Sequence, residues 1–237
     1  MNYNIKKYVT SALIIIILFS ILWYMQNDKA FISSIRGNIL LFMNGSLQGY
    51  SSQKVLVILT LFFLLFMNVH AIKESPSYLT RKADRTKIFN DRFINIFFSS
   101  ILFVTSYQIV NILFTFIFLG NEIMSTTNFY LITLLNAIAL IFFYCWVGLL
   151  NKLIEDWSNS RNITVVTTFV VVVISYYLET AFWVPIKDMR VYEGLLSGEW
   201  DLTDVCFVYI RQLGLVIVFY ILGKMIFYDK DFIIYEK

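Results

Sequence analysis

The residues Phe129–Leu150, FYLITLLNAIALIFFYCWVGLL, form an uninterrupted run of 22 residues without a charged side chain. At the α-helical rise of 1.5 Å per residue, such a run extends for about 33 Å. The hydrocarbon core of a bilayer is about 30 Å thick. We therefore expect this segment to be a helix that spans a membrane.

Five further stretches of comparable apolar character accompany it, at residues 8–25, 55–72, 93–119, 163–184 and 205–228. Two of them contain β-branched runs, which favour strands in water-soluble proteins. Here their length favours helices, because a segment in hydrocarbon must satisfy its own backbone hydrogen bonds. The expected fold class is all-α: a polytopic membrane protein with six transmembrane helices in a single domain, residues 1–237.

The composition excludes an ordinary soluble domain. Hydrophobic residues make up 59% of the 237 residues and charged residues 15%, whereas soluble domains average about 45–50% and about 25%. A core of this size does not hide that excess, because a globular surface must carry polar residues. We expect a multi-pass protein of the cell membrane.

Basic residues indicate the orientation of the chain. Of the 19 Lys and Arg residues, 13 fall on one side of the six expected spans and five on the other, while Arg211 lies inside the last span. Cytoplasmic loops of membrane proteins carry the excess of Lys and Arg. This bias predicts that both termini are cytoplasmic. The five residues expected outside are Lys29, Arg36, Lys54, Lys187 and Arg190.

Two outer connections are longer than the rest. Between residues 26 and 54, apolar side chains recur every three or four residues at Phe31, Ile35, Ile39 and Phe42. This spacing predicts a short amphipathic helix that lies on the outer membrane surface. The second connection, residues 185–204, carries four acidic residues and is expected to be an exposed acidic loop.

Residues suited to catalysis are scarce. The chain has a single histidine, His70, and one carboxylate, that of Glu179, well inside an expected span. Intramembrane catalysis needs a nucleophile with a base, a carboxylate dyad or a metal cluster. The phosphate-binding loop G-x-x-x-x-G-K-[S/T] does not occur in the sequence. We therefore expect no catalytic residues, no metal site and no cofactor in this chain.

The connection between the second and third spans, residues 75–92, is the most basic part of the chain. Ser75 and Pro76 predict the start of a short helix, and Asp84 predicts the cap of the next one. The result is a basic elbow that leads directly into the third span. Such an elbow either transmits a push from a cytoplasmic partner or only fixes topology and contacts anionic lipid.

The run Leu79–Phe89, LTRKADRTKIF, resembles the segment between spans two and three of small ABC-2-type transporter permeases. In that family the pattern is close to L-x-R-x-x-S-R-x-x-x-[F/W], and the segment is the coupling helix that docks on the ATPase subunit. Arg81, Arg85 and Phe89 match the pattern, while Asp84 stands where serine is usual.

The resemblance implies a permease subunit of an ABC exporter, similar to Gram-positive permeases for peptide or bacteriocin export or immunity. Its cargo is a peptide or another amphipathic molecule. The resemblance also implies a separate subunit that binds and hydrolyses ATP, and a second permease chain that is either identical to this one or different. Nucleic acid is not expected as a partner. The residues expected to dock on the ATPase are Tyr78, Leu79, Arg81, Arg85 and Phe89. The alternative is a stand-alone membrane immunity or sensor protein without an ATPase.

Two charged residues in the last two expected spans form a further candidate site. Glu179 lies about 7 Å and Arg211 about 9 Å from the outer boundary, at the helical rise per residue. Equal depth predicts an ion pair at the outer mouth of a cargo path. The alternative is that both side chains extend separately to the outer headgroups.

The charge bias predicts which loops an impermeant thiol reagent reaches. Cysteines placed at Ser77 or Asn159 should react only from the cytoplasmic side, because these loops lie on the side that carries 13 of the basic residues. Cysteines placed at Ser46 or Ser197 should react only from outside. Labelling is measured in intact cells and in inverted vesicles. Labelling of position 77 from outside would overturn the six-span topology.

Overall fold

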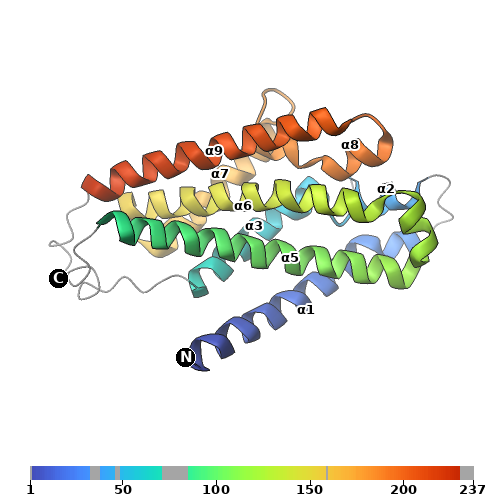
Figure 1. The fold of residues 1–237 in the computed structure, drawn as a ribbon, viewed down its shortest axis with the longest axis horizontal. Helices are drawn as coiled ribbons and strands as arrows, with labels where there is room; N and C mark the ends of the chain where they lie inside the picture. The colour runs from blue at the N-terminus through green and yellow to red at the C-terminus, as the bar shows by residue number, and fades with distance from the viewer. Residues whose placement is uncertain (1, 33–37, 46–48, 71–84, 159, 230–237) are drawn as a thin grey trace.

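The computed structural model describes residues 2–32, 38–45, 49–70, 85–158 and 160–229. In these ranges the regular structure is entirely helical (Figure 1). The elements are α1 (Asn2–Ile32), α2 (Ile39–Asn44), α3 (Gln53–His70), α5 (Arg85–Thr126), α6 (Phe129–Ser158), α7 (Arg161–Leu178), η1 (Pro185–Met189), α8 (Val191–Ser197) and α9 (Leu202–Asp229).

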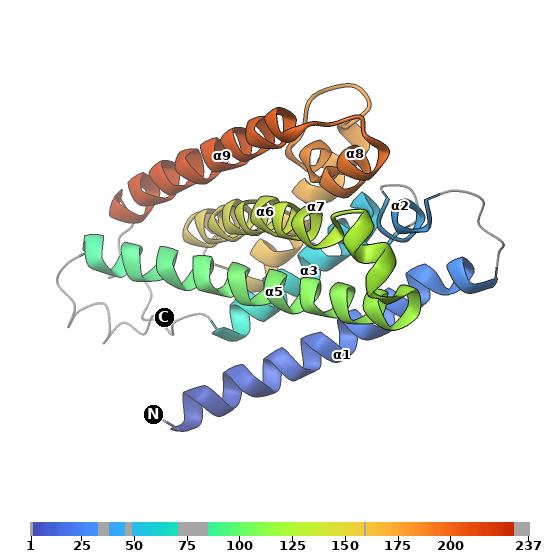
Figure 2. The same ribbon diagram turned by 45° about the vertical axis from the view of Figure 1, so that its right-hand side comes forward.

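Six of these helices, α1, α3, α5, α6, α7 and α9, are long and apolar enough to cross a bilayer, so the all-α six-span prediction is confirmed. Successive spans run in opposite directions, and η1 and α8 lie in the connection between the last two (Figure 1). Helix α1 therefore begins and α9 ends at one end of the bundle, called here the terminal end. The opposite end carries α2, η1 and α8 and is called the loop end (Figures 1 and 2).

The central helix of the bundle is α6. It packs against α3, α5, α7 and α9, and Figures 1 and 2 show it lying between them. In the most apolar windows of α3 and α6, 61% of residues are buried within the chain, against 22% in α1, α7 and α9. The peripheral helices thus leave most of their side chains to lipid, as their uniformly apolar sequences predict.

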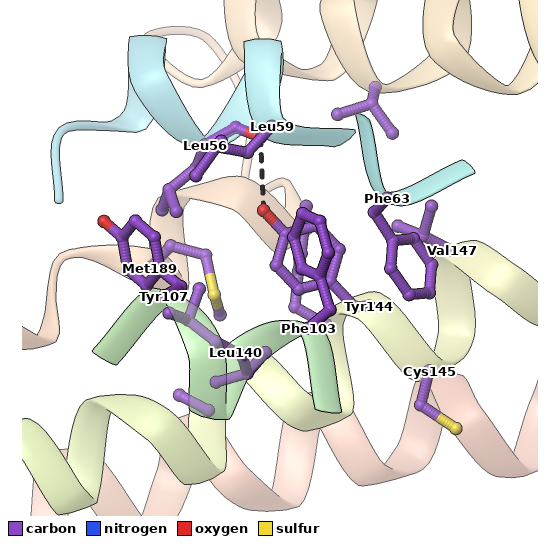
Figure 3. Packing of buried hydrophobic residues seen from close by; sticks show 14 of the residues in the cluster. Leu56, Leu59, Phe63, Phe103, Tyr107, Leu140, Tyr144, Cys145, Val147 and Met189 are labelled. Atoms are coloured by element: carbon purple, nitrogen blue, oxygen red, sulfur yellow. Dashed lines mark hydrogen bonds between the residues drawn. The ribbon is translucent and has the colours of Figure 1, made fainter. Parts of the chain in front are cut away.

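Aromatic rings fill the space around α6. The ring of Tyr144 lies 4.9 Å from that of Phe63 on α3 and 5.1 Å from that of Phe103 on α5 (Figure 3). The Tyr144 hydroxyl donates to the backbone carbonyl of Leu56 at 3.5 Å. Edge-to-face rings contribute about 0.5–1.5 kcal/mol beyond the burial of their area, so this cluster holds three spans together.

A glycine allows α6 to approach its neighbours closely. A Cβ atom added at Gly148 would lie 2.6 Å from Cγ2 of Ile96 on α5 and 3.1 Å from the sulfur of Met67 on α3. Small residues at helix contacts permit this close approach in membrane proteins. Gly214 on α9 differs, because a Cβ atom there would meet nothing within 4 Å.

Helix α5 is longer than the expected third span at both ends. It begins at Arg85, so Arg85, Lys87 and Arg92, which precede the expected span, are already helical. Near the loop end it breaks at Gly120, whose φ of 78° lies in the left-handed region. The last turn then continues in a new direction over the loop end (Figure 2).

The two connections expected on the outer side pack into the bundle in their described parts, which corrects two expectations. In α2, Leu40 and Met43 are fully buried, so the described part of the predicted surface helix does not lie on a membrane surface; Phe31 and Ile35 fall outside the described side chains. In the expected acidic loop, η1 buries Ile186 and Met189 against the spans. The connections pack inward and not outward because burial of their apolar residues against the spans removes apolar surface from water.

The contrast between the two glycines gives a test of packing. Gly148→Leu should lower the thermal stability of the detergent-solubilised protein by about 1–3 kcal/mol or more, because the added side chain overpacks the contact with α3 and α5. Gly214→Leu has the same change in helix propensity and should leave stability within about 0.5 kcal/mol. Equal midpoints of thermal unfolding for the two variants would contradict the central position of α6.

Candidate functional site

The predicted docking residues divide between described and undescribed parts of the chain. Tyr78, Leu79 and Arg81 lie outside the described residues. Arg85 is the first residue of α5, and its guanidinium donates to the backbone carbonyl of Tyr228 at the end of α9. The start of the third span is therefore held against the end of the sixth.

Phe89 does not lie on an exposed surface. It is 2% exposed, and its ring lies 5.2 Å from that of Tyr220 and 5.8 Å from that of Phe227, both on α9. The expectation of direct contact between Phe89 and a partner is therefore corrected. The ring is apolar and lies within the first turns of a helix that packs on α9, so its burial inside the chain is favoured.

One turn further along α5, a buried ion pair crosses the bundle. Arg92 Nη1 lies 2.5 Å from Asp156 Oδ2 on α6, and both side chains are less than 10% exposed. The guanidinium carbon also lies 4.5 Å above the ring of Phe227 on α9. Arg92, Asp156, Phe227 and Phe89, called here the terminal-end clamp, thus join α5, α6 and α9 immediately after the segment that resembles a coupling helix.

A second ionic site lies toward the loop end. The carboxylate of Asp188 on η1 is buried, and Arg211 on α9 donates to it through Nε at 3.0 and 3.1 Å and through Nη2 at 2.7 Å. Gln212 Nε2 and Trp183 Nε1 donate to the same carboxylate at 3.1 and 3.2 Å. Charge-assisted bonds from a fork-shaped guanidinium are stronger than neutral ones, so Asp188 holds η1 firmly against α9.

Gln212 links this ion pair to the central helix. Its Nε2 also donates to the carbonyl of Pro185 at 3.0 Å, and its Oε1 accepts from Trp146 Nε1 on α6 at 2.9 Å. Because Gln212 is fully buried, both ends of its amide need such partners. The arrangement binds α6, α9 and η1 into one unit.

The partner of Arg211 differs from the expected one. Helix α7 ends at Leu178, so Glu179 is its C-cap and not a residue five positions inside the span. The ion pair described for Arg211 is with Asp188, which corrects the predicted pairing with Glu179. The reason is that the segment after α7 folds back into the bundle and brings a nearer carboxylate to the guanidinium.

A third polar cluster contains no charged residue. Asn111 on α5 accepts from Trp23 Nε1 at 3.1 Å and donates to Asn44 Oδ1 at 2.8 Å and to the Tyr192 hydroxyl at 3.1 Å. The Tyr192 hydroxyl lies 2.8 Å from Thr133 Oγ1 and 3.3 Å from Gln108 Oε1. These side chains connect α1, α2, α5, α6 and α8 near the loop end, and all of them are buried. We call them the Tyr192 network; its members are Trp23, Asn44, Gln108, Asn111, Thr133 and Tyr192.

The Tyr192 hydroxyl stays protonated. Burial raises the pKa of Tyr192 well above its ordinary value, against the smaller opposing effect of the hydrogen bonds with Thr133 and Asn111. The neutral hydroxyl therefore has one proton to donate and lone pairs to accept at physiological pH. Both Thr133 Oγ1 and Gln108 Oε1 lie within hydrogen-bond distance of that proton.

Among the described residues, no group of three or more His, Cys, Asp or Glu side chains is placed to hold a metal ion. Comparisons with protein-family models, curated proteins and solved structures find no match to this chain. The function is therefore argued from the residues and their geometry.

Removal of the Asp188 charge tests the partner of Arg211. Asp188→Asn should destabilise the protein by up to about 2.5–3.5 kcal/mol, the cost of an unpaired arginine inside a bilayer. Glu179→Gln, the matched control, should have a much smaller effect. Thermal unfolding in detergent and the amount of protein recovered from membranes measure both variants. A larger loss in Glu179→Gln would restore the original pairing.

Proposed function

We propose that this chain is the membrane-spanning permease subunit of an ABC exporter that moves a peptide or another amphipathic cargo. One observation carries the proposal: the last residues of the segment that matches the coupling-helix pattern, Arg85–Phe89, form the first turn of α5, and the terminal-end clamp fastens α5 to α6 and α9. A force applied before Arg85 therefore reaches three spans at once.

Helix α5 is suited to transmit such a force. It is continuous from Arg85 to the break at Gly120 and packs against α1, α3, α6 and α9. A helix of this kind moves as a rigid body, because packed interfaces shift between discrete arrangements and do not deform smoothly. A tilt of α5 at the terminal end would shift the Tyr192 network, which α5 reaches through Asn111.

The ion pair of the clamp supports a positional role. A buried ion pair is often no more stabilising than a well-packed apolar substitute, whereas loss of one partner is costly. Arg92 and Asp156 therefore serve to fix how α5 and α6 meet more than to stabilise the bundle. In the proposed assembly the terminal end faces the cytoplasm, the ATPase subunit docks there, and a second permease chain lies beside this one.

The second candidate is an immunity or sensor protein that acts without an ATPase. The loop end favours it in one respect, because η1 and α8 form a packed outer structure that could hold an extracellular peptide. Co-purification separates the two candidates. A nucleotide-binding subunit recovered with the tagged chain from native membranes supports the exporter, and its absence supports the sensor.

Charge reversal tests the coupling segment. The double change Arg81→Glu and Arg85→Glu should release the ATPase or uncouple ATP hydrolysis from transport, while the chain still inserts in the membrane. The measurements are recovery of the complex and cargo transport in proteoliposomes. Because Arg85 also contacts the end of α9, Arg81→Glu alone provides a variant without that structural change.

The matched control reverses two basic residues at the other end of the bundle, Lys54 and Lys187. It removes the same charge without touching the proposed docking segment, so complex recovery and transport should stay at the unaltered level. Full recovery and transport in the Arg81 and Arg85 double variant would refute ATPase docking at this segment.

A further inference from the structure

Three buried amide side chains, one in the Tyr192 network and two within a helical turn of its members, carry unpaired polar atoms. Asn27 and Asn136 are each 1% exposed and Gln108 is 5% exposed. Within the described residues, neither polar atom of Asn27 or Asn136 has a hydrogen-bond partner, and Nε2 of Gln108 has none. Most buried polar side-chain atoms in proteins are hydrogen-bonded, so three such amides in one region require a physical account.

All three amides adjoin members of one network. Asn27 follows Trp23 by four residues on α1, and Asn136 follows Thr133 by three residues on α6. Residues three or four apart are neighbours on one helix face. Gln108 belongs to the network itself, because its Oε1 accepts from the Tyr192 hydroxyl. The unpaired atoms therefore come from α1, α5 and α6, at positions within one helical turn of members of the Tyr192 network or within it.

The depth of the cluster makes its polar atoms costly. Asn136 lies seven residues after the start of α6, or about 10 Å along the helix. Hydrocarbon supplies no hydrogen bonds to such a group. Asn27 lies near the loop-end limit of the first span, Thr10–Asp28. The amides thus extend from the rim of the bundle toward its interior.

The chemistry of the cluster identifies the class of ligand. The Tyr192 network and the two asparagines beside it contain no charged side chain, so the site offers no carboxylate to a metal cation and no basic group to an anion. Asn27 and Asn136 each present an unpaired donor and an unpaired acceptor, and Gln108 presents an unpaired donor. A small neutral molecule that donates and accepts hydrogen bonds fits both, and a buried water needs two to four polar partners of this kind.

We propose that Asn27, Gln108 and Asn136 hold water inside the bundle, and that the Tyr192 network is a hydrated site at membrane depth. Water there supplies the partners that the amides lack. It also lets the Tyr192 hydroxyl exchange Thr133, Gln108 and water as partners without leaving a buried group unpaired. This hydration is independent of the proposed transport function, because it follows from side chains that are present in either candidate.

X-ray radiolytic labelling tests the proposal in the full-length protein in lipid nanodiscs. Hydroxyl radicals formed from bound water oxidise side chains beside that water, whatever their distance from the surface. Tyr192, Tyr144 and Tyr50 are all buried to 1% exposure or less. Tyr144 lies in the apolar core, while Tyr50 lies near the loop end and bonds to the carbonyl of Tyr107. We expect Tyr192 to be oxidised many times faster than the other two.

Tyr50 serves as the control for transient opening of the loop end, because bulk water that enters there would oxidise it together with Tyr192. Equal, slow oxidation of Tyr192, Tyr50 and Tyr144 means a dry cluster and overturns the proposal. Equal, fast oxidation of Tyr192 and Tyr50 means bulk entry and also overturns it.

A pair of variants then assigns the water to the amides. Asn136→Leu, of similar size, should slow the oxidation of Tyr192 several-fold. Asn151→Leu on the same helix, about 22 Å further along α6, should leave it unchanged. Tyr144 reports folding in each variant, because loss of the core would expose it. Unchanged oxidation of Tyr192 in a folded Asn136→Leu variant, and in the double variant with Gln108→Leu, overturns the proposal.

Discussion

Hydrocarbon offers no hydrogen bonds, and the rest of this structure follows from that constraint. Backbone groups are satisfied within helices, which explains why β-branched runs that favour strands in water are helical in α1 and α7. Polar side chains at the same depth must find partners inside the bundle. Among the described residues, the terminal-end clamp, the pair of Arg211 with Asp188 and the Tyr192 network are the main examples. Each of these joins helices that are distant in sequence, so polar satisfaction and tertiary packing are achieved together.

The loop end shows how a connection becomes part of the core. Pro185 begins a short helix in which Ile186 and Met189 are buried among the spans, and Asp188 is carried inward with them. Burial of the two apolar side chains offsets the desolvation of the carboxylate, which Arg211, Gln212 and Trp183 then satisfy. The connection between α7 and α9 is therefore part of the bundle and not a separate loop. A displacement of α9 would move η1 with it through the ion pair of Arg211 with Asp188.

The two ends of α5 have different roles in the proposed mechanism. At the terminal end, Arg92 fixes the helix to α6 and α9 through an ion pair and a cation–π contact. Toward the loop end, Asn111 and Gln108 belong to the Tyr192 network, which is held by hydrogen bonds between neutral groups. A rigid attachment at one end and an adjustable one at the other suit a helix that transmits a displacement. Gly120 then separates this rod from the outer turn of α5.

The sequence alone determined that this protein has six spanning helices, because length and apolar composition are local properties that a bilayer reads directly. The bounds of α3 and α9 followed within a few residues, as did the start of α6, whereas α6 extends beyond the expected end of its span to Ser158. The ionic partners of polar side chains did not follow from the sequence. Arg211 was recognised as a candidate site, but its partner Asp188, 23 residues away in an expected loop, was not. The tertiary structure decided that pairing, the burial of Phe89 and the convergence of Trp23, Asn111 and Tyr192. The physical reason is that burial and hydrogen bonding depend on which helix faces meet, and in a chain that is apolar on all sides the amphipathic pattern that would reveal those faces is nearly absent.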